Sequence, residues 1–395
     1  MLFSVLKKIS INGTLEIIDY KNTKYIFGSS NPVLRIKLTN KSIENKLFFN
    51  PSLYFGEGYM NEEIIIEDGT IEQLIDMVTS SYDDFTKNNK FFKTYESISS
   101  FFKPFQQINK LINSKQNVSH HYDLSEELYN LFLDKDMQYS CGYFHNPNIS
   151  LDQAQIDKKN HIITKLQISE NMKVLDIGCG WGGMAIEIAK QTGAYVKGIT
   201  LSENQLATAS KRAQEEGLSE KVTFKLQDYR DEKENYDRIV SVGMFEHVGL
   251  KFYRTFFKTI NSLLKSDGVA LLHTIGSIDK PQPGSPFITK YIFPGGVVPS
   301  YSQIIRPLEK SGLIVSDVET LIRHYDKTLE SWLERFMNKK SEVKDLFDDK
   351  FVRCWEFYLS SCAAAFKYRD LVVFQLQLVK NFDAIPSNRR DYIYS

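Results

Sequence analysis

The sequence has few cysteines, and they are not clustered. Cys141, Cys179, Cys354 and Cys362 form no CxxC pair and lie in no His-rich segment with metal-ligand spacing. This argues against a disulfide framework and against a cysteine-ligated metal site. We expect reduced thiols, no bound metal and a cytosolic protein.

Long apolar runs and an excess of one charge are also lacking. No stretch approaches the roughly 18 apolar residues that a membrane-spanning helix needs, and the first fifteen residues lack a secretory h-region and cleavage site. The 49 basic and 49 acidic residues cancel, whereas nucleic-acid binders normally carry a basic surplus. We therefore expect no nucleic-acid partner, and the sequence leaves a homodimer open.

The 395 residues, 42% of them hydrophobic, are enough for two domains. Residues 14–69 hold four strand-like segments bounded by Asn, Gly, Ser and Pro, namely 15–20, 24–28, 33–38 and 62–69. Residues 70–82 then read as one amphipathic helix with Thr70 as its N-cap. The sequence predicts a small, mostly β accessory domain over residues 1–80.

Residues 81–118 are rich in Lys, Phe, Asn and Ser, and we interpret them as a basic-aromatic linker. One interpretation is a connecting helix whose phenylalanines pack on the main domain. The other is a segment that lies on a membrane surface, with the Lys and Phe residues of 81–105 as its contacts.

From residue 151 onward, helical and strand-like segments alternate, as in a parallel sheet with helices on both faces. Helices are predicted over 151–166, 182–192, 202–217 and 253–264, and strands over 173–178, 195–200, 221–227, 236–244 and 268–276. The closing region, 327–380, is predicted to be strongly helical and amphipathic. We assign residues 119–395 to this catalytic domain.

A glycine-rich loop follows the first of these strands. It contains Asp176, Gly178, Gly180, Gly182 and Gly183, and such glycines let the backbone turn sharply and approach a ligand. The loop also fits the dinucleotide pattern GxGxxG, but the second strand does not end in the acid that a dinucleotide site needs. The order D-x-G-x-G instead resembles class I methyltransferases, which favours S-adenosylmethionine as the ligand.

Other polar residues end the neighbouring strands, where open α/β sheets bind their ligands. Asp228 follows the third strand and could accept a hydrogen bond from adenine; the alternative is a surface turn acid. Glu246 and His273 end the next two strands, and segments 139–144 and 323–332 converge on the same edge. Taken alone, Glu246 could be an exposed loop acid and His273 a hydrogen-bonded core histidine. Because both end strands beside the predicted donor loop, a functional role is favoured.

Over about residues 120 to 380, the chain resembles the cyclopropane-fatty-acyl-phospholipid synthase family, which includes the mycolic acid cyclopropane synthases. The segments that carry this resemblance are HHYDLSEELYNLFLDKDMQYSCGYF, VLDIGCGWGGMAIEIA, GITLSENQ, DRIVSVGMFEHVG, LLHTIG, KYIFPGG and CAAAFKYRDLVVFQLQL. The resemblance implies an α/β fold, the class I Rossmann-like methyltransferase with a seven-stranded sheet. The N-terminal strands suit the accessory domain of bacterial phospholipid-acting members.

The resemblance also implies roles for individual residues. The donor S-adenosylmethionine would be held by the glycine-rich loop and by Tyr139, Ser140, Thr200, Leu201, Ser202, Gln205, Tyr229 and Arg230. A bicarbonate ion would contact Cys141, Glu246, His273, Ile275 through its backbone, and Tyr325. Cys362 matches a cysteine long regarded as catalytic in the family, although this chemistry needs no protein nucleophile and a buried helix thiol is the simpler interpretation.

The implied reaction is transfer of a methylene unit to the cis double bond of an unsaturated membrane phospholipid, at the inner face of the membrane. The aromatic helices after residue 327 would wall the acyl channel, and 290–296 would be its lid. Three alternatives stay open: methylation of the double bond without ring closure, methylation of a small amine, and a membrane-associated scaffold with a vestigial donor pocket. Presence of the whole bicarbonate set favours ring closure.

Overall fold

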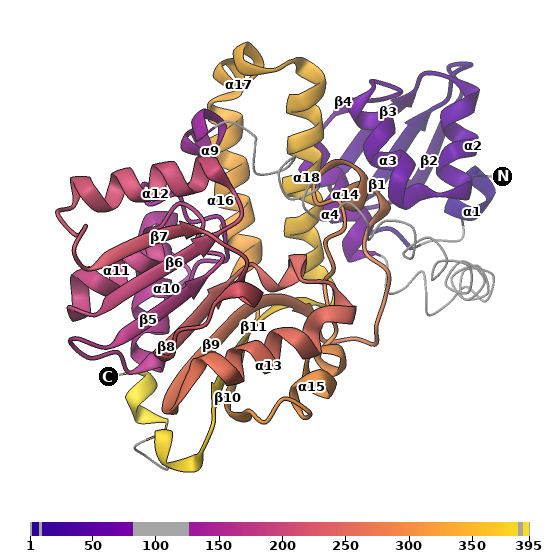
Figure 1. The fold of residues 1–395 in the computed structure, drawn as a ribbon. Coiled ribbons are helices and arrows are strands. Elements are labelled where there is room, and N and C mark those ends of the chain that lie inside the picture. Colours follow the sequence, from indigo (N-terminus) through magenta and orange to yellow (C-terminus); the bar gives the residue numbers. More distant parts are fainter. Residues whose placement is uncertain (1, 8–9, 82–125, 386–389, 395) are drawn as a thin grey trace. The chain divides into compact units, whose positions relative to one another are not determined.

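A computed structural model of the chain describes residues 2–7, 10–81, 126–385 and 390–394 (Figure 1). The chain divides into two compact units. The first comprises residues 1–114, 282–294 and 329–370, and the second comprises residues 115–281, 295–328 and 371–395. Two segments of the predicted catalytic domain therefore group with the N-terminal residues. The predicted linker, apart from residue 81, lies outside the described residues.

The first unit contains a four-stranded sheet with the order β2-β1-β3-β4. Its strands are β1 (Thr14–Ile18), β2 (Lys24–Gly28), β3 (Val33–Leu38) and β4 (Ile64–Asp68). All four coincide with the predicted segments. Helix α4 (Ile71–Ser80) starts at Thr70, which forms a reciprocal capping box with Gln73. The predicted N-terminal sheet and its following helix are thus confirmed.

This unit also contains helices that were not predicted, namely α1 (Leu2–Leu6), α2 (Lys41–Phe49), α3 (Pro51–Met60) and α14 (Pro286–Tyr291). Two more, α17 (Lys340–Leu346) and α18 (Asp349–Tyr368), fall in the region that was predicted to be helical. Asn40 caps α2 by accepting from the Ile43 N–H, and Pro51 occupies the first turn of α3, where its missing N–H costs nothing.

We predict that Gly56→Ala destabilises the first unit, although alanine normally favours helices by about 1 kcal/mol over glycine. A Cβ at Gly56 would lie 2.4 Å from the Phe287 ring and 2.7 Å from the Phe357 ring. Relieving that overlap costs about 1–3 kcal/mol, so urea denaturation should show a net loss. Gly58→Ala is the comparison on the same helix, because a Cβ there would lie 2.8 to 2.9 Å from aliphatic atoms of Ile43 and Ile64 and would meet no aromatic ring among its three nearest atoms; a more stable Gly56→Ala protein would contradict the packing.

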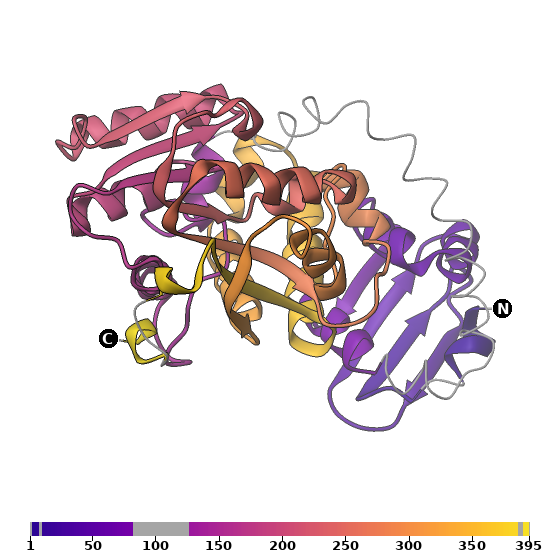
Figure 2. The same ribbon diagram turned by 60° about the horizontal axis from the view of Figure 1, so that its bottom comes forward.

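The second unit contains a seven-stranded sheet with the order β10-β11-β9-β8-β5-β6-β7 (Figures 1 and 2). Its strands are β5 (Lys173–Ile177), β6 (Tyr195–Thr200), β7 (Val222–Leu226), β8 (Tyr236–Val242), β9 (Leu264–Ser277), β10 (Ile314–Leu321) and β11 (Leu371–Val379). The pairs among β5 to β9 are parallel, and β11 runs antiparallel between β9 and β10. This sheet confirms the predicted α/β fold.

The prediction of helix through residue 380 is wrong over β11, and β10 was not located from the sequence. Strand β11 is buried along nearly its whole length, and a short continuous apolar run cannot be told from a buried helix by periodicity alone. The rest of 327–368 is helical, in α16 (Tyr325–Asn338), α17 and α18.

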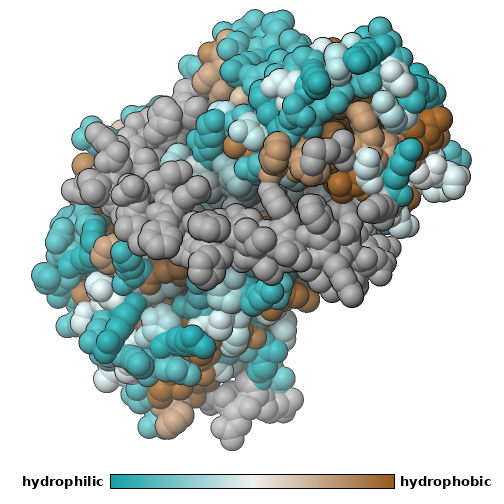
Figure 3. All heavy atoms as spheres, turned by 90° about the vertical axis from the view of Figure 1, so that its right-hand side faces the viewer, coloured by the Kyte–Doolittle hydropathy of each residue, from teal (hydrophilic) through white to brown (hydrophobic). Residues whose placement is uncertain are grey.

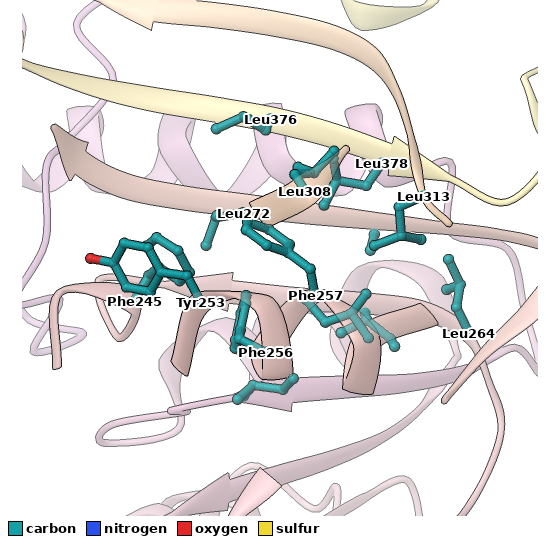
Figure 4. Packing of buried hydrophobic residues seen from close by; sticks show 14 of the residues in the cluster. Phe245, Tyr253, Phe256, Phe257, Leu264, Leu272, Leu308, Leu313, Leu376 and Leu378 are labelled. Atoms are coloured by element: carbon teal, nitrogen blue, oxygen red, sulfur yellow. The ribbon is translucent and has the colours of Figure 1, made fainter. Parts of the chain in front are cut away.

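Helices cover both faces of the large sheet. They are α9 (Glu126–Phe132), α10 (Leu151–Leu166), α11 (Gly183–Thr192), α12 (Glu203–Glu215), α13 (Tyr253–Leu263) and α15 (Tyr301–Leu308). One core packs α13 and α15 on the sheet, where Phe256 and Phe257 meet Leu272 and Leu376 (Figure 4). A second core joins α10, α11 and α12 to the other face. Because helices cover both faces of the sheet, a ligand can reach it at the carboxyl ends of the strands.

Polar side chains predominate on the surface seen in Figure 3, with hydrophobic ones in small patches. Among the described residues, no helix combines the length and the apolar character required to cross a bilayer. These residues also contain no group of three or more His, Cys, Asp or Glu side chains placed to hold a metal ion.

Candidate active site

The glycine-rich loop lies between β5 and α11, and three of its glycines have left-handed backbone angles. The φ values are +79° at Gly178, +53° at Gly180 and +84° at Gly182. A Cβ at Gly178 would come within 2.6 Å of Met244, and one at Gly182 within 2.8 Å of Ala209. A Cβ at Gly180 would meet no atom of the described residues within 4 Å, apart from its chain neighbours. Gly180 therefore borders open space, as expected where backbone approaches a ligand.

The end of β6 forms a second wall of this site. The Thr200 hydroxyl donates to Gln205 Oε1 at 2.7 Å, and Ser202 caps α12 by accepting from the Gln205 N–H. These three side chains are buried, whereas Leu201 is about half exposed. The hydrogen bonds fix Gln205 at the strand end, where other nucleotide-binding folds place an acid.

Asp228, Tyr229 and Arg230 lie together in a short turn after β7. The Asp228 carboxylate accepts from the Arg230 backbone N–H at 2.9 Å and from its guanidinium at 2.9 and 2.6 Å. These bonds show the turn-capping role that was the alternative for Asp228; its contact with adenine stays a prediction. Tyr229 packs edge-on against Phe256, and burial raises its pKa to about 12.

Residues 139–141 reach the same edge of the sheet from the loop before α10. Tyr139 packs edge-on against Tyr129 with ring centroids 5.1 Å apart. The buried Ser140 hydroxyl accepts from Lys158 Nζ at 2.8 Å. Burial raises the pKa of the Cys141 thiol far above its usual range, so that thiol is neutral and acts as a weak donor to the Gly142 carbonyl at 3.2 Å.

Glu246 and Ile275 are in direct contact. Glu246 lies in the short turn η3 (Phe245–His247) after β8, and its Oε1 accepts from the Ile275 N–H at 2.6 Å. Burial raises the pKa of Glu246, and its Oε2 is buried with no hydrogen-bond partner within the described ranges. A buried acceptor oxygen of this kind can take a hydrogen bond from a ligand or an ordered water.

His273 lies two residues before Ile275 on β9 and is buried. Its Nδ1 is 3.2 Å from the Gln375 amide nitrogen of the neighbouring β11. Burial holds the pKa of His273 well below its usual range, so the imidazole is neutral. Since Nδ1 accepts from Gln375, the ring proton resides on Nε2, which makes Nε2 a donor. The sequence reasoning missed Gln375 because β11 was predicted as helix.

Tyr325 begins α16, and this end of the helix is joined to the 139–144 segment. The Gly142 N–H donates to Thr328 Oγ1 at 3.0 Å, and the Phe144 N–H donates to His324 Nδ1 at 3.0 Å. Tyr325 belongs to the second unit with the other predicted site residues.

Cys362 lies on α18, in the first unit, and is the one predicted site residue outside the second. Burial raises the pKa of its thiol to about 12. A thiol with such a pKa is a poor nucleophile at neutral pH, which supports the interpretation of Cys362 as a helix thiol.

Asp176 ends β5 with a buried carboxyl group whose Oδ2 has no partner among the described residues. Burial raises its pKa to about 7, against a lowering influence of the Lys158 charge. Removing this charge should stabilise the ligand-free protein by up to a few kcal/mol at neutral pH. We therefore predict that Asp176→Asn unfolds at higher urea concentration than wild type at pH 7 but binds the donor more weakly.

The pH dependence of that difference follows from the direction of the pKa shift. The folded pKa lies above the unfolded value, so the wild-type protein loses stability as pH rises from about 4 to about 7. Urea denaturation at several pH values measures the free energy of unfolding of both proteins. Asp176→Asn should be no more stable than wild type below about pH 4, and more stable by a constant amount above about pH 7. An advantage that is independent of pH would contradict the burial of an ionisable Asp176.

Known protein families match both parts of this sequence. The family model described as mycolic acid cyclopropane synthetase matches residues 109–376, and a model for a domain of unknown function matches residues 3–90. The chain is 44% identical over 256 residues to the cyclopropane-fatty-acyl-phospholipid synthase of Escherichia coli K12, a match that spans 65% of this chain and 65% of that enzyme.

Two other similarities bear on the site. The chain is 40% identical over 274 residues to a probable fatty acid methyltransferase of Pseudomonas putida, covering 67% of this chain and 69% of the relative. The crystal structure of the mycolic acid cyclopropane synthase CmaA1 with SAH and CTAB aligns with a TM-score of 0.64 at 34% identity, covering 67% of this chain and 97% of CmaA1. The class I methyltransferase fold predicted from the sequence is confirmed by this likeness.

Proposed function

Because this chain belongs to the mycolic acid cyclopropane synthetase family, we propose that it transfers a one-carbon unit from S-adenosylmethionine to the cis double bond of an unsaturated phospholipid acyl chain, forming a cyclopropane ring. The observation that carries this proposal is the buried pair of Glu246 and the Ile275 N–H, with an unpartnered carboxylate oxygen and the neutral His273 on the same strand. Glu246 lies two residues after Met244, whose side chain lies against Gly178 of the glycine-rich loop.

Support for the donor comes from the loop and from the comparison with CmaA1, which was crystallised with SAH. The open space at Gly180 would admit it, and the residues at the β6 end, the 228–230 turn and segment 139–140 would hold it. When bound, S-adenosylmethionine supplies a sulfonium methyl group that is strongly electrophilic. The protein then needs to place the acceptor in line with the sulfur–methyl bond.

The proposed reaction balances without an added oxidant or reductant. The alkene electron pair forms a bond to the methyl carbon, while the sulfur–methyl electron pair stays on sulfur as the neutral thioether. The other alkene carbon becomes a cation, and loss of one proton from the transferred methyl group gives the electron pair that closes the ring. An apolar site that excludes water prevents capture of the cation as an alcohol.

Glu246, Ile275 and His273 fit a bicarbonate ion. The unpartnered Glu246 Oε2 needs a donor, and bicarbonate carries one O–H group. His273 can donate from Nε2 to another bicarbonate oxygen, with Cys141 and Tyr325 as further contacts. Bound there, the ion would supply the base that removes a proton from the transferred methyl group. Glu246 and His273 would orient it.

A methyl-branched or methylene product is the second candidate. The relative from P. putida is a probable fatty acid methyltransferase, and loss of the proton from a different carbon would leave a methylated chain that is not cyclised. Methylation of a small amine needs no site for removing a proton from the methyl group. The Glu246 and His273 arrangement therefore favours transfer to an acyl double bond over amine methylation, and the structure of the labelled product separates ring closure from branching.

We further propose that the protein binds the inner face of the membrane peripherally, through the interleaved Lys and Phe residues of 81–105, which lie outside the described residues. Replacing the Lys and Phe residues of that segment should abolish co-flotation with anionic phospholipid vesicles and leave S-adenosylhomocysteine binding intact. Unchanged flotation would exclude this segment as the membrane contact.

The test of the proposed function is incubation of purified protein with methyl-labelled S-adenosylmethionine and vesicles of unsaturated phospholipid. Mass spectrometry and NMR of the released acyl chains should show a saturated chain that carries a labelled ring methylene. A labelled chain that is branched and still unsaturated would mean that the final proton is lost from a carbon other than the transferred methyl group. Absence of label from the lipid would overturn the substrate assignment.

A further inference from the structure

Helix α10 carries a fully buried lysine, Lys158, that has no part in the functions described above. Lysine is almost never fully buried unless its ammonium group is paired. Lys158 lies between Ala154 and Ile162 on the buried face of the helix, at the i−4 and i+4 spacing of core positions. A lysine at such a position calls for an explanation beyond solubility.

The contacts of Lys158 lead to the segment proposed to hold the methyl donor. Its Nζ donates to Gln138 Oε1 at 2.7 Å and to Ser140 Oγ at 2.8 Å. One turn earlier on α10, Gln155 donates from Nε2 to the Ser140 carbonyl at 2.9 Å. Side chains from two adjacent turns of α10 therefore fix Ser140 through both its side chain and its backbone.

The Asp134 carboxylate lowers the cost of burying the Lys158 charge and forms hydrogen bonds within residues 134–138. The buried Asp134 accepts from the Gln138 N–H at 2.9 Å and from the Asp136 N–H at 3.0 Å. Burial lowers the pKa of Lys158 to about 8, while the Asp134 charge opposes that shift. The Lys158 charge also acts on Asp176 and on Cys141. Lys158 is thus close enough to the Asp176 carboxyl group and the Cys141 thiol for its charge to act on both.

We propose that Lys158 is a positioning residue for the methyl donor: its ammonium group holds Gln138 and Ser140, and so keeps Tyr139 and Ser140 in the orientation that binds the donor. This inference rests on the proposed donor site. Four atoms of 138–140 accept hydrogen bonds from α10, and Lys158 donates the two that end on side-chain oxygens. Loss of the ammonium group therefore frees the Gln138 and Ser140 side chains.

Lys165 is a matched comparison on the same helix. It is equally buried, but its ammonium group pairs with Glu319, which also contacts His161. Among the described residues, its ammonium group pairs with Glu319 and Asp317 and forms no hydrogen bond with segment 138–141. Lys158→Met and Lys165→Met therefore remove the same group from the same helix at the same depth, and only the first removes a contact to the donor segment.

The experiment is calorimetric titration of the full chain with S-adenosylhomocysteine, together with thermal unfolding. Both variants should unfold at lower temperature than wild type. Lys158→Met should bind S-adenosylhomocysteine on the order of tenfold to a hundredfold more weakly, the effect of losing charge-assisted hydrogen bonds, while Lys165→Met stays within about threefold of wild type. In the transfer assay, Lys158→Met should raise the donor KM more than it lowers kcat.

Equal affinities of Lys158→Met and wild type, or equal losses in both lysine variants, would overturn the proposal. Failure of the wild-type protein to bind S-adenosylhomocysteine would instead overturn the donor site itself. If Lys158→Met does not fold, Lys158→Gln and Ser140→Ala replace it. Their effects on affinity should be less than additive in the double variant, and additive effects would show that Lys158 does not act through Ser140.

Discussion

Replacing Glu246 by alanine is expected to reduce turnover by about a hundredfold to ten-thousandfold, the range that positioned acid–base groups contribute, and to leave S-adenosylhomocysteine binding unchanged. The side chain contacts the Ile275 N–H and not the glycine-rich loop. Its loss disturbs the proposed proton-removal site and spares the donor site. The vesicle assay measures turnover, and calorimetry measures binding.

Glu246→Gln is the matched control for folding. Its amide oxygen can still accept from the Ile275 N–H, so the buried backbone donor keeps a partner. We expect it to be as stable as wild type or more stable, because burial disfavours the charge of Glu246, and to remain impaired in turnover. Normal turnover in Glu246→Ala would show that the proton is removed elsewhere.

Gly180→Ala is expected to weaken donor binding by about a hundredfold, comparable to the effect of a misplacement of about 1 Å in a catalytic site. The added methyl group would enter the open space beside Gly180, where we propose that the donor lies. Beyond its chain neighbours, it meets no atom within 4 Å in the part of the chain that the structure describes. Calorimetric titration with S-adenosylhomocysteine measures this loss.

Gly217→Ala separates this effect from backbone strain. Gly217 has φ +68°, close to the +53° of Gly180, and a Cβ there also meets no other described residue within 4 Å. Both substitutions place alanine in a left-handed conformation at a cost of about 1–2 kcal/mol. Both should lower stability alike, and only Gly180→Ala should lose donor affinity. Equal affinities would mean that the space at Gly180 is not the donor site.

Much of the fold was accessible from the sequence because it depends on local pattern. The four N-terminal strands alternate and end at turn residues, and the helix from Ile71 carries its own capping box. Helices separate the strands around the glycine-rich loop, except that β7 and β8 are joined by a short turn. Strand β11 was missed because its buried position on both faces erases the alternation. Its assignment as helix also hid Gln375.

The sequence by itself determined the α/β fold, the glycine-rich loop and the polar residues at the strand ends, because hydrophobic period, glycine spacing and strand order are local properties that parallel topology converts into one shared edge. Only the tertiary structure decided that Glu246 pairs with the Ile275 N–H, that Gln375 sets the tautomer of His273, and that Lys158 reaches Ser140. These contacts join residues that are 29, 102 and 18 positions apart. Strand register and helix packing fix such contacts, and no local sequence pattern encodes them.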